Sequence, residues 1–159
     1  IIKNDKFFLQ KCVFETLRLH PASPVAWRKA VSPSKILEKK NIKEGDLIIV
    51  DLWNSNRDIS VYGIDATKYN PYREISKNYP PWGLTFGVGS HSCLARVLDG
   101  GEIPKEGTDI NNHNFGLITC FMKSLLDSGA KISQKDIPHL DSKTERQNWG
   151  EYPIIFKKE

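Results

Sequence analysis

The segment from Asp5 to Leu19 constrains the fold more than any other part of the sequence, because it predicts a helix that must be buried. At about 100° per residue, its apolar side chains cover nearly every direction around the helix axis. Only one narrow sector remains for Lys11, Glu15 and Arg18. Asp5 is a suitable N-cap, and a proline shortly after the segment ends the helix. The rest of the chain must therefore pack around this helix.

The charged sector of this helix contains Glu15 and Arg18, which are neighbours at positions i and i+3. On a solvated surface such a pair stabilises a helix by only about 0.2–0.5 kcal/mol. Because the remainder of the helix is apolar, we expect this sector to face protein, where a buried pair needs further partners to offset its desolvation. The sequence thus predicts a third charged group from elsewhere in the chain, and an arginine of the later irregular segment is the best candidate.

Composition is typical of one compact unit of 159 residues, 39% apolar and 26% charged, and is too polar for a membrane span. The formal net charge of +4 is mild, and the lysines are scattered, so no nucleic-acid-binding surface is expected. The three cysteines are far apart and odd in number, which argues against a disulfide framework and favours a reducing, cytoplasmic setting. The chain does not begin with Met, so we interpret it as a fragment of a longer protein.

The remaining pattern predicts a mainly α fold with small β elements, in the α+β class. Between residues 54 and 82 no period is sustained, and a long irregular segment of this kind usually has a function. The expected elements are strands at Val25–Lys29, Leu47–Leu52 and Tyr152–Phe156, helical turns at Leu94–Asp99, and a helix at Phe115–Ser128 followed by Gly129. Residues 100–114 interrupt the last two helical stretches and are interpreted as an insertion or loop.

The stretch FGVGSHSCLAR, Phe86 to Arg96, is the strongest candidate for chemistry. Gly87 and Gly89 let the backbone turn N–H groups toward one point, and a helix expected to begin at Cys93 adds its positive end. Both effects favour a thiolate over a thiol at Cys93. Three alternatives stay open at this stage, namely an inert buried thiol, a nucleophile with His91 as base, and a zinc site that adds His113 and Cys120.

Taken together, four motifs resemble the C-terminal portion of the cytochrome P450 superfamily of haem-thiolate monooxygenases. ETLRLHP (residues 15–21) is similar to the family's E-x-x-R helix, and FGVGSHSC (residues 86–93) is similar to its F-x-x-G-x-x-x-C cysteine loop. NRD (residues 56–58) and YNPYR (residues 69–73) resemble the signatures between them. The resemblance runs from about Lys11 to Arg96. It implies that the whole chain, 1–159, is a single partial domain of that fold, ending in a last helix and a terminal hairpin.

The resemblance implies haem b as the cofactor and Cys93 as the proximal iron ligand, whose thiolate pushes electron density onto the iron. Loop N–H groups would bond to the sulfur and tune it, as Gly87 and Gly89 permit, and Phe86 would pack beside it. His91 and Arg28 match positions that bind the haem propionates. Ala95 replaces the family's usual glycine.

By the same resemblance, Arg73 would be the third partner of Glu15 and Arg18, and this trio would have a structural role. The segment before and within the first strand would face the substrate. Its candidate residues are Ser23, Val25, Ala26 and Trp27, which suggest a mainly hydrophobic ligand surface.

The implied activity is insertion of one oxygen atom from O2 into a small hydrophobic organic substrate, with electrons from a ferredoxin- or flavodoxin-type partner. Arg96 would lie near that partner, and His91 favours the soluble, cytoplasmic bacterial type, although a membrane anchor upstream of this chain stays open. The family's long central helix precedes the E-x-x-R helix, so we expect this chain not to enclose a haem from both sides. The alternative is a non-catalytic remnant or interaction module that cannot hold haem on its own.

Overall fold

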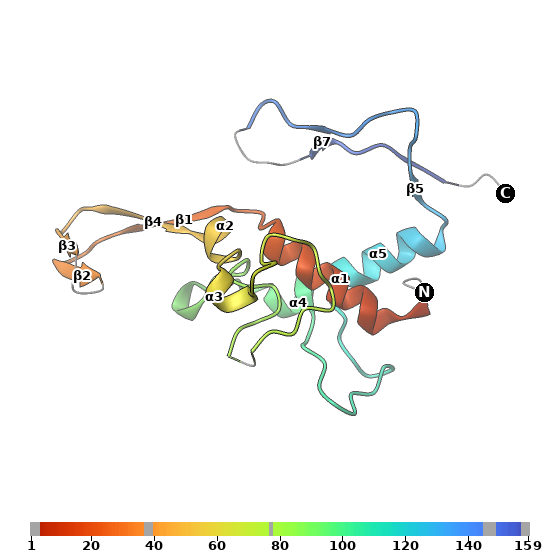
Figure 1. Cartoon of the computed structure of the whole chain (residues 1–159), viewed down its shortest axis with the longest axis horizontal. Coiled ribbons are helices and arrows are strands. Elements are labelled where there is room, and N and C mark those ends of the chain that lie inside the picture. The colour runs from red at the N-terminus through yellow and green to blue at the C-terminus, as the bar shows by residue number, and fades with distance from the viewer. Residues whose placement is uncertain (1–3, 37–39, 77, 145–148, 157–159) are drawn as a thin grey trace.

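The computed structural model describes residues 4–36, 40–76, 78–144 and 149–156 (Figure 1). Its helices are α1 (Lys6–Leu19), α2 (Leu52–Ser55), α3 (Ile59–Tyr62), α4 (Arg96–Gly100) and α5 (Leu117–Asp127), with a 3-10 turn at Gly89–His91. Its strands are β1 (Val25–Lys29), β2 (Ser34–Ile36), β3 (Lys40–Ile42), β4 (Leu47–Asp51), β5 (Lys131–Ile132), β6 (His139–Leu140), β7 (Trp149–Glu151) and β8 (Ile154–Ile155). The predicted mainly α fold with small β elements is confirmed.

Helix α1 begins and ends as the sequence predicts. The Asp5 carboxylate accepts a hydrogen bond from the Phe8 N–H at 2.9 Å, which satisfies one of the N–H groups left free at a helix start. At the other end the His20 N–H donates to the Thr16 carbonyl. Its buried side chains include Val13 and Phe14 and also the polar and charged Gln10, Glu15 and Arg18. The helix therefore forms the centre of the packed region.

The strands pair as four separate two-stranded antiparallel ladders, β1 with β4, β2 with β3, β5 with β8 and β6 with β7. The first two form a long arm that extends to one side of the helices, and the last strands form a second arm (Figure 1). The strand predicted at Leu47–Leu52 ends at Asp51, because the Asp51 carboxylate accepts from the Asn54 N–H and caps α2. The single strand predicted at Tyr152–Phe156 is wrong in extent, since only Ile154–Ile155 pairs there, opposite Lys131–Ile132.

Three aromatic side chains form the core cluster that connects α1 to the cysteine loop. Phe14 meets Trp82 edge-on with ring centroids 5.1 Å apart, and Trp82 meets Phe86 in the same way at 5.6 Å. All three are buried, and Leu17 packs against them. Edge-to-face contacts of this kind favour one relative orientation of the rings. The segment that leads into the cysteine loop is thereby fixed against α1.

The predicted helical turns after Cys93 begin later than expected. α4 starts at Arg96 with Ala95 at its N-cap position, and Cys93 lies before it in a turn closed by the Arg96 N–H donating to the Cys93 carbonyl at 3.2 Å. The prediction that a helix begins at Cys93 is therefore wrong. With only five residues before Gly101 ends it, α4 also has little dipole to offer the thiol.

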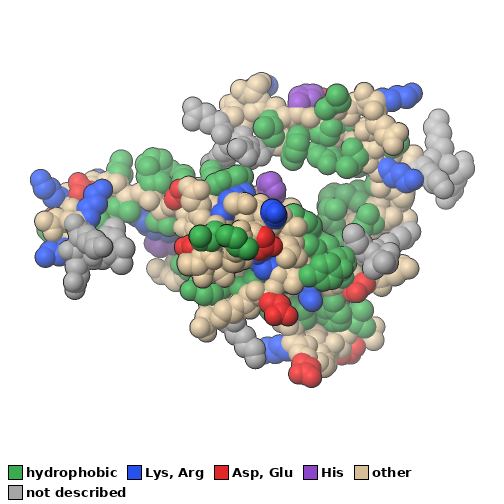
Figure 2. Space-filling model, in the orientation of Figure 1, with side chains coloured by type: hydrophobic (Ala, Val, Ile, Leu, Met, Phe, Trp, Pro, Cys, Tyr) green, Lys and Arg blue, Asp and Glu red, His purple; other side chains and the backbone are tan. Residues whose placement is uncertain are grey.

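Helix α5 ends as predicted, with Gly129 at φ 72° just beyond Ser128, but its apolar side is only partly covered. Phe121 is 64% exposed and Met122 37%, while Thr119 is its only buried residue. Hydrophobic side chains are accordingly visible over much of the face in Figure 2. Among the residues that the structure describes, no helix has both the length and the apolarity to cross a membrane.

Candidate functional site

A buried charge network connects α1 to the irregular segment. Arg18 is fully buried and binds Glu15 through two hydrogen bonds of 2.7 Å each, from Nε and Nη2. Arg73 brings its Nε to 3.3 Å from the same carboxylate and its Nη1 to 2.6 Å from Asp65. The third charged group expected beside Glu15 and Arg18 is thus Arg73. The sequence pattern missed Asp65, which lies in the irregular segment with no periodic signal to mark it.

The network holds Glu15 ionised despite its burial. Burial alone would raise its pKa, but the hydrogen bonds from Arg18 and from the Asn70 N–H, together with the charges of Arg18 and Arg73, hold the pKa below the usual value for glutamate. The Arg73 hydrogen bond likewise lowers the pKa of Asp65. Arg18 also donates to the backbone carbonyls of Asn56 and Ala66, so its guanidinium is fully engaged. The charges of these groups are therefore paired within the network.

Asn56 connects the end of α1 to the segment before the cysteine loop. Its fully buried amide donates to the Arg18 carbonyl at 2.9 Å and to the Thr85 hydroxyl at 3.2 Å, and its Oδ1 accepts from the Leu84 N–H at 2.7 Å. Gly83 approaches so closely that a Cβ there would lie 2.3 Å from Asn56 Oδ1. The motif NRD pointed to this residue, but its bridging contacts had no signal in the sequence.

The cysteine loop is a tight turn that two glycines make possible. Gly87 and Gly89 have φ values of 66° and 65°, and a Cβ on Gly87 would lie 2.9 Å from the His91 carbonyl oxygen. The Cys93 N–H donates to the Phe86 carbonyl at 2.7 Å, which closes the loop onto the aromatic core. The Cys93 side chain is exposed, so the loop presents it at the surface.

The surroundings of Cys93 bear on the chemical alternatives. The N–H groups of Leu94 and Ala95, the two residues that follow Cys93, donate to no described residue. His91 makes no hydrogen bond with Cys93 in the part of the chain that the structure describes, so no thiolate–imidazole pair is formed. Within the same residues no three His, Cys, Asp or Glu side chains gather as a metal site, and the proposed zinc set is not brought together.

The candidate residues of the segment 23–28 bond to one another locally, and none of them bonds to a described candidate of the cysteine loop. Arg28 is exposed on β1 opposite Ile48 and donates to the Trp27 carbonyl at 2.7 Å. The Trp27 side chain is 59% exposed, and Ser23 donates to the Val25 carbonyl at 3.2 Å. No hydrogen bond or ion pair joins these residues, Ala26 or His91 to Cys93 among the described positions. Phe86 lies in the aromatic core, with 9% of its surface exposed, and its packing beside the Cys93 sulfur stays a prediction.

The sequence model of the family described as Cytochrome P450 matches residues 6–98, which is more than half of the chain. The chain belongs to the cytochrome P450 family. The matched range holds the E-x-x-R helix, the irregular segment and the cysteine loop, the three parts that the buried network and the aromatic cluster join.

Curated P450 relatives match the same region. Cytochrome P450 71A20 of Arabidopsis thaliana is 32% identical over 91 residues, which cover 54% of this chain and 18% of that protein. The cytochrome P450 monooxygenase cicH of Emericella nidulans is 32% identical over 108 residues, 64% of this chain and 22% of its own length. This P450 chain therefore spans about a fifth of these relatives. They are eukaryotic, so the bacterial type suggested by His91 stays a prediction.

Solved P450 structures share the fold over nearly the whole chain. CYP109E1 from Bacillus megaterium, in complex with testosterone, superposes with a TM-score of 0.72 at 19% identity, covering 96% of this chain and 37% of that one. The structure of CalO2 gives the same TM-score at 18% identity and covers 98% and 34%. The fold likeness thus continues past residue 98, where the family's sequence match ends, through α5 and the terminal strands.

Proposed function

We propose that this chain is the haem-ligating C-terminal part of a cytochrome P450 monooxygenase, in which the Cys93 thiolate is the proximal ligand of the iron. The observation that carries the proposal is the cysteine loop. Its Cys93 is exposed, and the N–H groups of the next two residues, Leu94 and Ala95, donate to no described residue. Such N–H groups stabilise a thiolate and tune its basicity. When bound, haem b supplies the activation of O2 for insertion of one oxygen atom into an organic substrate.

The residues around Cys93 fit a flat, largely apolar macrocycle held by one thiolate. Two apolar side chains near the cysteine face solvent. Leu94, which follows it, is fully exposed, and Val88, which precedes it in the loop, is 60% exposed. A bound haem would cover such groups, whereas a zinc ion would need further ligands that do not gather here. His91 and Arg28 are exposed cations or potential cations that can bind the two propionates.

For the substrate and the electron donor, we propose a chemical class only. Val25 and Trp27 share one face of β1 and give it apolar side chains, which suits a small hydrophobic substrate such as the steroid that CYP109E1 holds. Arg96 is exposed three residues after the ligand and makes no ion pair with a described residue, so it is free to attract an acidic ferredoxin- or flavodoxin-type donor.

The ligand assignment is tested by replacing Cys93 in the P450 protein that contains this sequence. Cys93→Ala should abolish the red-shifted Soret band of the reduced, CO-bound protein, which is the signature of thiolate-ligated haem. Cys120→Ala is the matched control, because Cys120 is the other exposed free cysteine, and it should leave the band in place. A Cys93→Ala protein that kept the band would show that another residue ligates the iron.

A second candidate function is a non-catalytic remnant, favoured by the break between α4 and α5 and by Ala95. Haem titration of the 159-residue chain tests whether the chain can hold haem on its own. We expect weak or no stoichiometric binding by this chain alone, and tight one-to-one uptake would contradict that expectation.

A further inference from the structure

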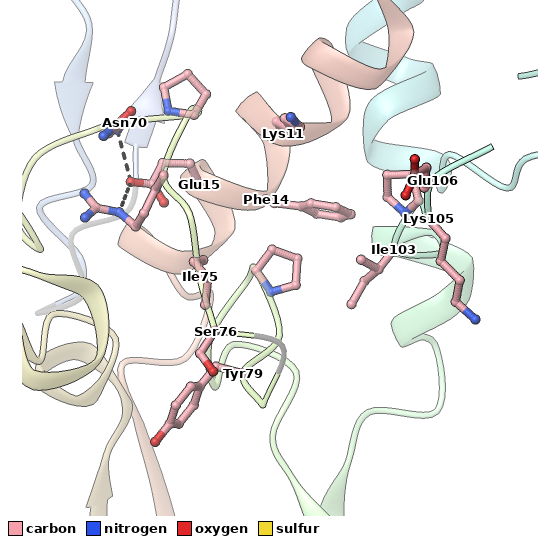
Figure 3. Close-up of a pocket in the computed structure, with 14 residues that line it drawn as sticks. Lys11, Phe14, Glu15, Asn70, Ile75, Ser76, Tyr79, Ile103, Lys105 and Glu106 are labelled. Carbon is pink, nitrogen blue, oxygen red and sulfur yellow. Dashed lines mark hydrogen bonds and ion pairs between the residues drawn. The ribbon is translucent and has the colours of Figure 1, made fainter. Parts of the chain in front are cut away.

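We propose that the chain carries a second ligand site, away from the cysteine loop, which binds a small apolar organic anion such as an aryl alkanoate. The site is a cleft between α1, the irregular segment at residues 70–76 and 79–81, and the loop of residues 101–116 between α4 and α5 (Figure 3). This proposal does not depend on haem binding. It rests on how the loop is anchored, on the lining of the cleft and on its unpaired charges.

The loop is anchored by Gln10, a fully buried side chain of α1. Its Nε2 donates to the Glu102 and Phe115 carbonyls at 3.1 and 3.2 Å, with a longer contact of 3.5 Å to the Gly100 carbonyl. Its Oε1 lies 3.0 Å from His113 Nε2, which must be the donor because an amide oxygen can only accept. One amide therefore holds both legs of the loop against α1.

Two glycines bring the legs of the loop into contact at its base. Gly101 and Gly116 have φ values of 81° and 78°, and a Cβ on Gly116 would lie 2.4 Å from the Gly101 nitrogen. Just above them the Glu102 N–H donates to the Asn114 carbonyl at 2.8 Å. Closed in this way, the loop is a compact Ω-type loop and supplies a preformed wall. A preformed site costs less ordering when a ligand binds.

The cleft has the size and lining of a small-molecule site. Its volume is about 840 Å³, within the range usual for ligand pockets. Phe14 reaches from α1 toward Ile103 of the loop, and Ile75 lies across from them (Figure 3). Pro71, Pro81 and Pro104 complete the apolar lining. Ile103 is 47% exposed, so a ligand that covers it removes apolar surface from water.

The charges around the cleft favour an anion. Lys11 and Lys105 line it and form no ion pair with any described residue, whereas Glu106 is the single acidic side chain there without a described partner. The Glu15 carboxylate, which also borders the cleft, is already neutralised by the Arg18 and Arg73 guanidinium groups. The surplus of about one positive charge matches a monoanion.

Two hydroxyl groups add hydrogen-bond donors for a carboxylate. Tyr79 and Ser76 line the cleft, and neither side chain bonds to a described residue. An apolar lining with a few convergent polar groups is the usual design of a pocket that orients a small ligand. With its apolar body in the cleft, a ligand would have its carboxylate at the rim, where one of these donors or one of the lysines can bind it.

The test uses three probes that share a 4-phenylbutyl group and differ in the charge of the end group. Each is titrated into the 159-residue chain and followed by calorimetry. We expect one saturable site with 4-phenylbutyrate binding most tightly, 4-phenylbutan-1-ol about tenfold more weakly and 4-phenylbutylamine weakest of all. Amide shifts in NMR should cluster at residues 103–106, 70–76 and 79–81 rather than at the cysteine loop. Absence of saturable binding, equal affinity for the amine, or shifts confined to the cysteine loop would overturn the proposal.

Matched variants locate the site. Ile103→Asp should weaken 4-phenylbutyrate at least about tenfold, whereas Ile110→Asp, on the same loop at 44% exposure but outside the cleft, should change it less than about twofold. Lys11→Glu with Lys105→Glu should reverse the preference from acid to amine. Lys131→Glu with Lys143→Glu, which makes the same charge change elsewhere, should not. Binding that survives Ile103→Asp, or that responds equally to both lysine pairs, would refute the site.

Discussion

The buried charge network makes a strong prediction about Glu15→Gln, a change that removes one negative charge and almost no volume. Glu15 is 3% exposed and Arg18 is fully buried, so the variant leaves a guanidinium without its main counter-charge. Removing one partner of a buried pair costs about 3–5 kcal/mol. The amide oxygen retains part of the hydrogen bonding, so we expect a loss of about 3 kcal/mol in the free energy of unfolding.

Urea unfolding followed by circular dichroism measures this loss. For an m-value of about 2 kcal/mol/M, the unfolding midpoint should fall by about 1.5 M. Lys123→Gln is the control, because it removes one charge from the exposed Lys123–Asp127 pair of α5 and should cost less than about 1 kcal/mol. If Glu15→Gln cost no more than Lys123→Gln, the buried charges would not stabilise one another as described.

Three further predictions concern stability. The folded state holds the pKa of Glu15 below the usual value for glutamate, so its contribution is complete above that usual value and is lost as the pH falls through the folded pKa. Unfolding measured against pH should therefore show a decline in acid for the wild type that Glu15→Gln reduces, and identical slopes would contradict the assignment. Gln10→Met keeps the side-chain volume but leaves the Glu102 and Phe115 carbonyls without their donor, so it should lower the free energy of unfolding in urea by about 3 kcal/mol. Gln134→Ala, at an exposed position, should lower it by almost nothing. Gly116→Ala should destabilise the chain by more than about 3 kcal/mol in thermal melts, whereas Gly107→Ala, with a similar φ but open space, should cost only about 1 kcal/mol, and equal losses would show that the loop base is not tightly closed.

The sequence predicted what local rules and burial determine. The Asp5 cap depends on a contact three residues away, and the end of α5 depends on the glycine that follows it. Arg73 could be anticipated because a charge pair on an otherwise apolar helix needs a further partner. The fold class and the family followed from the same residues.

What the sequence missed depends on contacts between distant segments. Gln10 is a polar residue on an otherwise apolar helix, and this position is a signal of a buried polar contact. The sequence could not indicate its partner, because the loop that it binds lies about 90 residues later in the chain. The terminal strands are two or three residues long, too short for a period to appear. The start of α4 was misplaced because a turn at Cys93 and a helix at Cys93 have the same sequence pattern.

The closed base of the 101–116 loop has a consequence for how this region of the chain can vary. The backbone leaves α4 and returns to α5 at nearly the same point, with Gly101 and Gly116 in direct contact, so the loop adds residues without displacing the helices on either side. Insertions or deletions between these glycines change the length of the protein but not the position of the cysteine loop. This is a place where lineages can gain or lose sequence, and where a tag or reporter domain can be grafted, while both neighbouring helices keep their register.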